Sequence, residues 1–354
     1  MPWPPERRAH ARRVALTLAL ALPAALACAW ARVPLPWMIG PLLVTALCGV
    51  AGVPLAASVH QRNVGLACIG MALGLYFTPT VVGLLLPLAP AVLAGVLWAL
   101  ALGYAFYRFL LRLNGGDVPT AFFAAAIGGA SEMAVLAERH QGRVDRVAAA
   151  HSLRVLLVVV LIPLSYQALG LHGVDTTLPA LPSVRWPGLA LLAAASSGGI
   201  AVLWRLGAPN PWVLGALAVT AALTAAGVEL SALPKAATNA GQLFIGVALG
   251  TRFTPDFARA APRWLASVAA GTLLMMAASA LFAAGLARAT GLHTATVLLG
   301  TSPGGIAEMA ITAQVLQLGV PVVTLFQVVR YVAVLTLTGP LYRLEQRRLA
   351  SAPA

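Results

Sequence analysis

Long apolar runs alternate with short polar segments along the whole chain, and the order of the runs occurs twice. Runs of about 18 or more apolar residues are typical of membrane-spanning helices. The first copy begins with the run at residues 14–31, and the second begins with the run at 187–204. No long polar block separates the runs. The pattern therefore predicts an all-α polytopic membrane protein without a soluble domain.

The sharpest repeated motif is a glycine pair followed by a glutamate. Gly128 opens the sequence Gly-Gly-Ala-Ser-Glu-Met, and Gly304 opens Gly-Gly-Ile-Ala-Glu-Met, 176 positions later. A Pro-Trp pair at Pro36 returns at Pro211, at an offset of 175. Motifs that recur in order at a nearly constant offset indicate an internal duplication.

The duplication divides the chain into two membrane repeats with short tails and a linker. The predicted boundaries are an N-terminal tail at 1–13, repeat 1 at 14–170, a linker at 171–186, repeat 2 at 187–343 and a C-terminal tail at 344–354. Arginines before the first run resemble the start of a signal peptide. Because the second copy has an equivalent first run, we expect this segment to be retained as a helix.

Charge placement bears on whether the copies are parallel or inverted. The chain is 60% hydrophobic and 9% charged, with a net charge of +13 carried almost entirely by arginine. If the fifth segment of each copy enters and leaves on one side, each copy crosses the membrane five times and the copies are inverted. Most arginine-rich loops and both termini then lie in the cytoplasm, as the positive-inside rule requires. Six plain spans in each copy, which would make the repeats parallel, are the alternative.

Glu132 and Glu308 are the strongest candidate functional residues. A carboxylate inside an apolar run is costly and usually faces a cavity or a partner. The glycine pairs before them, Gly128 with Gly129 and Gly304 with Gly305, permit a broken helix with exposed N–H groups, to which Ser131 could add a hydroxyl. The alternative is that each glutamate merely caps a helix end.

Arg154 and Arg330 follow these glutamates by 22 residues, each within the last apolar run of its copy. Either they form structural ion pairs with the glutamates, or they bind an anionic substrate through their planar guanidinium groups. His151 lies one helical turn before Arg154, but Gln327 takes that place in copy two. We therefore expect His151 to have a polar packing role outside the shared design.

The third segment of each copy is a second candidate site. Asn63 and Asn239 lie near its start, and a G-x-x-x-G pattern and Phe-Thr-Pro follow in both copies. The pattern permits close helix packing. An interrupted helix lining a binding site at the membrane midplane is the alternative.

The sequence disfavours several function classes. Its three cysteines lie in apolar runs without metal-ligand spacing, and we expect neither a metal nor another cofactor. No nucleophile–base set or phosphate-binding loop is recognisable, so we expect no enzyme and no ATP-driven pump. The arginines lie in short loops, which favours a topological role over direct nucleic-acid binding.

The remaining hypotheses are a secondary transporter and a sensor. We expect a transporter of a small solute that works by alternating access, with the lipid bilayer and a solute or ion as partners and a homodimer as one possible assembly. The alternative is a membrane sensor that influences gene expression indirectly, without transport.

These motifs together resemble the membrane AbrB family of bacterial proteins built from a duplicated domain. The resemblance rests on the two Pro-Trp pairs, the two Ala-Leu-Gly segments that end in Phe-Thr-Pro, and both Gly-Gly-x-x-Glu-Met motifs. It implies a multi-pass protein of the bacterial cytoplasmic (inner) membrane that is associated with regulation of gene expression. Members are also labelled as ammonia monooxygenases, but no metal-ligand set here supports that activity.

Overall fold

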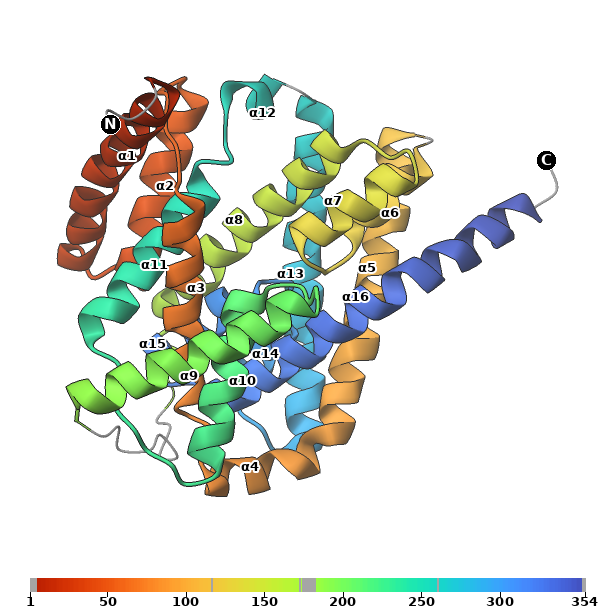
Figure 1. Cartoon of the computed structure of the whole chain (residues 1–354). Coiled ribbons are helices and arrows are strands. Elements are labelled where there is room, and N and C mark those ends of the chain that lie inside the picture. The colour runs from red at the N-terminus through yellow and green to blue at the C-terminus, as the bar shows by residue number, and fades with distance from the viewer. Residues whose placement is uncertain (1–4, 116, 172, 174–182, 260, 352–354) are drawn as a thin grey trace. The chain divides into compact units, whose positions relative to one another are not determined.

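A computed structural model of the chain describes residues 5–351 except 116, 172, 174–182 and 260 (Figure 1). These residues form α-helices, one 3-10 turn and no strand. Helices of the first copy are α1 (Pro5–Trp30), α2 (Pro36–Val50), α3 (Val59–Gly74), α4 (Pro79–Leu85), α5 (Ala89–Asn114), α6 (Val118–Ala125), α7 (Ala130–Arg139) and α8 (Val144–Ala168). Those of the second copy are α9 (Trp186–Arg205), α10 (Pro211–Ala225), α11 (Lys235–Gly250), α12 (Pro255–Arg259), α13 (Pro262–Thr290), α14 (Thr294–Thr301), α15 (Ile306–Leu316) and α16 (Val320–Ala350). Each helix of the first copy thus has a counterpart, in the same order, in the second.

Within the described residues, six helices are long and apolar enough to cross a membrane. The all-α polytopic prediction is confirmed. Helix α1 begins at Pro5, before the predicted start at residue 14, and α16 continues to Ala350. Parts of both predicted tails are therefore helical. Most of the predicted linker at 171–186 lies outside the described residues.

The helices form two compact units that do not follow the sequence repeats. Unit 1 comprises Met1–Leu86, Val159–Ala260 and Ala310–Pro321, and unit 2 comprises Pro87–Val158, Ala261–Met309 and Val322–Ala354. The first four helices of each copy belong to unit 1. Helices α5–α7, α13, α14 and most of α16 belong to unit 2. Both units therefore combine equivalent helices from the two copies.

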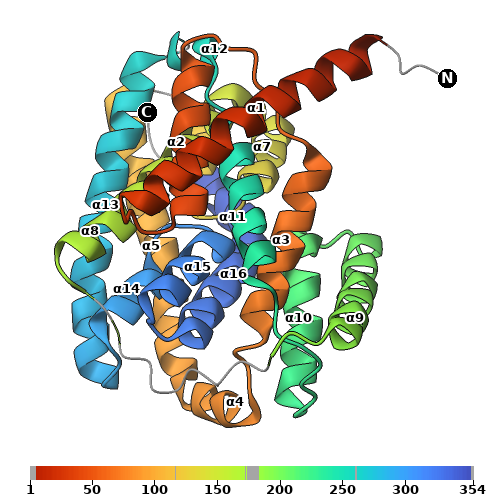
Figure 2. The ribbon, with the colours of Figure 1, turned by 90° about the vertical axis from the view of Figure 1, so that its left-hand side faces the viewer.

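Glycines allow the helices of unit 1 to pack closely, in matching ways. A Cβ on Gly70 would lie 3.1 Å from the Ala216 Cβ and would overlap the Val213 carbonyl oxygen, so α3 approaches α10 closely. The equivalent Gly246 lies against Met38, whose carbonyl oxygen would be 2.5 Å from an added Cβ, so α11 approaches α2 (Figure 2). The G-x-x-x-G pattern therefore packs helices.

The Phe-Thr-Pro motif starts a new helix after each of these packing segments. Thr78 caps α4, because its hydroxyl accepts a hydrogen bond from the Val81 N–H at 3.4 Å. The Thr254 hydroxyl accepts one from the Phe257 N–H at 3.2 Å. Proline at the next position suits the first helical turn, where no N–H partner is needed. The motif thus supplies a cap and a helix start in both copies.

In unit 2 the equivalent helices α5 and α13 run antiparallel and lie side by side (Figure 1). Trp98 stacks on Phe282 with ring centroids 4.5 Å apart. At the other end of the contact, the Asn114 amide donates to the Ser267 hydroxyl at 2.8 Å. From the first contact to the second, the residue number increases along α5 and decreases along α13. Equivalent helices of the two copies therefore point in opposite directions.

Candidate functional site

The first Gly-Gly motif lies at the tip of a helical hairpin formed by α6 and α7. The Thr120 hydroxyl near the start of α6 accepts a hydrogen bond from the Arg143 N–H, just after α7, at 2.7 Å. Phe123 stacks on His140 with centroids 5.6 Å apart. The start of α6 and the end of α7 therefore lie at the same end of the hairpin. This is the geometry that the re-entrant interpretation requires of the first copy.

The second copy has the same helix, break and helix. Helix α14 ends at Thr301, four residues follow, and α15 begins at Ile306. In the first copy α6 ends at Ala125 and α7 begins at Ala130. We call residues 126–129 the first break and residues 302–305 the second break. Both sequences interrupt the helix at the predicted glycine pair.

The second glycine of each pair makes room for the glutamate. An added Cβ at Gly129 would overlap the Glu132 carboxylate, and one at Gly305 would overlap the Glu308 carboxylate. Gly129 is the N-cap of α7, which places Glu132 at the third helical position. A glutamate there can reach back toward the free N–H groups of the first turn. The capping interpretation of the glutamates therefore agrees with their conformation, and it leaves both carboxylates at the breaks.

The first glycine of each pair makes room for the methionine. A Cβ at Gly128 would be 3.0 Å from the Met133 methyl group, and one at Gly304 would be 2.7 Å from the Met309 Cγ. Met133 and Met309 are fully buried. The motif therefore forms one local structure. The buried methionine side chain packs against the first glycine, and the glutamate carboxylate lies over the second glycine at the start of the helix.

Both glutamates are partly exposed, whereas the residues beside them are not equivalent in the two copies. Ser131 is exposed and its counterpart Ala307 is buried, so a serine hydroxyl is not part of the shared structure. Glu132 accepts a hydrogen bond from the Tyr331 hydroxyl at 3.3 Å. The first copy has Val155 at the position of Tyr331. Sequence reasoning missed Tyr331, although a tyrosine directly after a candidate arginine in an apolar run was a usable signal.

Arg154 on α8 forms hydrogen bonds with backbone carbonyls at the first break and not with a carboxylate. Its guanidinium donates to the carbonyl oxygens of Ala124 at 3.3 Å and Ala126 at 3.1 Å. These carbonyls lie at the C-terminal end of α6, where no further helical turn can satisfy them. The partial negative charge of that helix end also favours a cation.

Arg330 on α16 does the same at the second break. It donates to the Ser302 carbonyl oxygen, and to the Gly304 carbonyl oxygen at 2.6 Å. Both arginines are buried, with 2% of Arg154 and 4% of Arg330 exposed. Within the described part of the chain, neither forms an ion pair with a carboxylate. The structural ion pairs considered as one alternative are therefore not formed.

His151 and Gln327 also have equivalent contacts, despite their different chemistry. The His151 Nε2 lies 3.0 Å from the Phe123 carbonyl oxygen, and the Gln327 amide donates to the Leu299 carbonyl oxygen at 2.7 Å. Phe123 and Leu299 are themselves equivalent positions. The sequence interpretation excluded this position from the shared design because it compared residue types. The structure shows a shared polar contact to the helix before each break.

The other predicted site residues belong to the other compact unit. Asn63 and Asn239 lie in α3 and α11 of unit 1, and both are partly buried. The glutamates, the glycine pairs and the arginines all belong to unit 2. In the residues that the structure describes, no group of three or more His, Cys, Asp or Glu side chains is arranged to hold a metal ion.

The chain is similar to known bacterial proteins over most of its length. The chain is 26% identical over 339 residues to "Uncharacterized protein YhjN" of Bacillus subtilis (strain 168), covering 87% of this chain and 86% of the relative. It is 25% identical over 327 residues to "Putative regulator AbrB" of Escherichia coli (strain K12), covering 91% of this chain and 90% of the relative. No solved structure matches significantly. The family described as "Transition state regulatory protein AbrB" matches residues 37–346, and the chain therefore belongs to the AbrB family.

Proposed function

We propose that this protein is a secondary transporter that moves a small solute across the membrane by alternating access. One observation carries the proposal: unit 2 contains two equivalent helix breaks, each with a glutamate in the first turn of the helix that follows. Paired broken helices in duplicated membrane proteins are typical of substrate and ion sites in transporters.

Inverted repeats are part of this proposal. The antiparallel packing of α5 on α13 supports inversion, because equivalent helices related by an axis along the membrane normal would run parallel. The hairpin of α6 and α7 supports five crossings in the first copy. With both termini in the cytoplasm, this topology also places most arginine-rich loops on the cytoplasmic side of a bacterial inner membrane.

The two kinds of charged residue have different roles in this mechanism. Arg154 and Arg330 hold the carbonyl ends of α6 and α14 and so keep each break in shape. Glu132 and Glu308 remain at the starts of α7 and α15, and they supply the carboxylates that bind a coupling cation or a cationic group of the solute. Because Tyr331 contacts Glu132 while its neighbour Arg330 contacts the second break, α16 touches both breaks. No catalytic step or cofactor is required.

A regulator without transport is the second candidate. The names of the family and of the Escherichia coli relative favour it. A sensor needs a way to pass its signal to a partner. We propose that any effect on gene expression follows indirectly from the change in solute concentration.

Transport in proteoliposomes separates the two candidates. The purified protein is reconstituted, a proton or sodium gradient is imposed, and uptake of a panel of metabolites is measured. We expect gradient-dependent uptake of at least one solute, and its loss in Glu132→Gln and Glu308→Gln variants that remain folded. The Gly339→Ala variant is the matched control, because the space around Gly339 is open. Binding of a solute without any uptake, under either gradient, would favour the regulator.

A further inference from the structure

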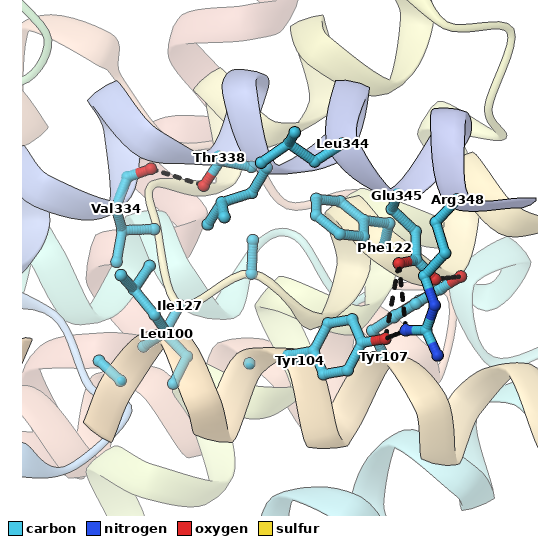
Figure 3. A pocket seen from close by; sticks show the side chains of 14 residues that line it. Leu100, Tyr104, Tyr107, Phe122, Ile127, Val334, Thr338, Leu344, Glu345 and Arg348 are labelled. Atoms are coloured by element: carbon cyan, nitrogen blue, oxygen red, sulfur yellow. Dashed lines mark hydrogen bonds and ion pairs between the residues drawn. The ribbon is translucent and has the colours of Figure 1, made fainter. Parts of the chain in front are cut away.

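A cavity of about 370 Å³ lies within unit 2 between α5 and α16 (Figure 3). It reaches the first break, since Ala126 and Ile127 line it. Its volume is at the small end of the range of roughly 300–1,000 Å³ that is typical of small-molecule sites. The proposed transport mechanism does not use this cavity.

Most of the cavity wall is apolar. Leu100 of α5 faces Val334 of α16 across it, and Ile127 lies beside them (Figure 3). The Thr338 hydroxyl also lines the cavity, but it donates to the Val334 carbonyl oxygen of its own helix at 2.5 Å. The hydroxyl hydrogen is therefore already used, so an acceptor or anionic group of a ligand would find no side-chain donor in this part, and burying it there would be costly. The body of the ligand must therefore be apolar.

The other end of the cavity is polar and centres on Glu345. This glutamate is buried, with 6% of its side chain exposed. The Tyr107 hydroxyl donates to its Oε1 at 3.2 Å, and the Tyr104 hydroxyl approaches its Oε2 at 3.5 Å (Figure 3). The carboxylate thus has tyrosine partners on both oxygens and is poorly placed to bind a ligand cation.

Two arginines leave this end with an excess positive charge. Arg108 lies 4.0 Å from the Glu345 Oε1, and Arg348 lies 3.8 Å from its Oε2. Two cations therefore face one carboxylate. Arg348 donates through Nη1 to the Tyr104 hydroxyl at 2.6 Å, and its side chain is 66% exposed. Its Nε and Nη2 have no partner among the described residues and can donate to an anionic group.

The polar end joins one helix from each copy, and the equivalent positions of the two copies do not repeat it. The positions equivalent to Glu345 and Tyr107 are Leu169 and Ala283. The buried carboxylate, the two tyrosines and the two arginines thus form a cluster between α5 of the first copy and α16 of the second that the equivalent positions do not repeat, which indicates a function specific to this junction.

We propose that this cavity binds an amphipathic anion, with its apolar chain or ring between α5 and α16 and its single carboxylate or phosphate group at Arg348. A free carboxylic acid and a membrane lipid share this chemistry. The experiment below distinguishes these two sources.

Three probes with the same chain and different end groups test the proposal. Octanoate, octanol and octylamine are titrated by calorimetry into the full-length protein in lipid nanodiscs. We expect octanoate to bind at least about five- to tenfold more tightly than the other two, because only its charge is complementary. Arg348→Gln should remove that preference and leave octanol binding unchanged. Arg347→Gln, an exposed charge on the same helix that does not line the cavity, should retain it.

Two variants that fill the cavity test its location. Gly103→Leu and Leu100→Trp each place a large side chain in the apolar part and should abolish binding of octanoate, with helical content preserved. If only one of the two variants folds, that variant is sufficient for the test. Equal affinity for the three end groups, or full octanoate binding in a folded filled variant, would overturn the proposal. Native mass spectrometry identifies the source: phospholipid retained by the parent protein and lost from Gly103→Leu indicates a lipid, whereas octanoate binding without retained lipid indicates a free carboxylate. Either supports the proposal.

Discussion

Replacing Gly129 by alanine tests whether the Glu132 carboxylate lies where the structure places it. The backbone of Gly129 has φ −69° and ψ 137°, which alanine adopts without strain. The added Cβ would instead overlap the carboxylate. The carboxylate must then leave the start of α7. The loss in free energy of unfolding caused by Gly129→Ala should therefore depend on whether Glu132 is present.

The expected cost follows from what the carboxylate loses. A side-chain cap at a helix start contributes about 0.5–2 kcal/mol, and a negative charge there about 0.3–1 kcal/mol. Gly129→Ala should therefore lower the free energy of unfolding by about 1–2 kcal/mol. In the Glu132→Ala background the overlapping carboxylate is gone, and the same substitution should lower the free energy of unfolding by less, because only the weaker N-cap preference of alanine and the Tyr331 hydroxyl near the added Cβ remain.

A double-mutant cycle measures this difference. The four proteins are unfolded reversibly in mixed detergent micelles, and the interaction energy is taken from the non-additivity. Gly339→Ala is the control, because the open space around Gly339 leaves only the helix-propensity effect, a gain of up to about 1 kcal/mol. Equal costs of Gly129→Ala in both backgrounds would refute the placement of the carboxylate over Gly129.

Three further predictions concern the arginines and the topology. Glu132→Gln and Arg154→Gln should have additive effects on the free energy of unfolding, since no ion pair joins them; a coupling above about 1 kcal/mol would contradict this. Arg330→Lys should lower thermal stability nearly as much as Arg330→Gln, because one ammonium group does not reproduce a planar donor to two carbonyls, and full rescue by lysine would contradict it. In a cysteine-free background, single cysteines at the equivalent exposed positions Arg139 and Val315 should be labelled from opposite sides of the membrane, with Arg139 cytoplasmic; labelling from one side would contradict inverted repeats.

The linear sequence contained most of the architecture. Hydrophobic runs long enough to span a bilayer predict helices regardless of context, because an unsatisfied backbone is too costly in lipid. The duplication was equally visible, since each motif has a local cause: glycine at a helix contact, threonine and proline at a helix start. The helical hairpin of α6 and α7 could be inferred because glycines and a charge within an apolar run oppose a continuous span.

Only the tertiary structure decided the partners of the charged residues. From the sequence, Arg154 could either pair with Glu132 or bind an anionic substrate, yet the arginine binds the carbonyls of Ala124 and Ala126. Sequence records side-chain chemistry, but free carbonyl groups appear only where a helix stops. The cavity at Glu345 was invisible for a related reason, because its polar end joins residues of α5 and α16 that are more than 200 positions apart. Such pairs become neighbours only when the two copies pack together, which no local pattern specifies.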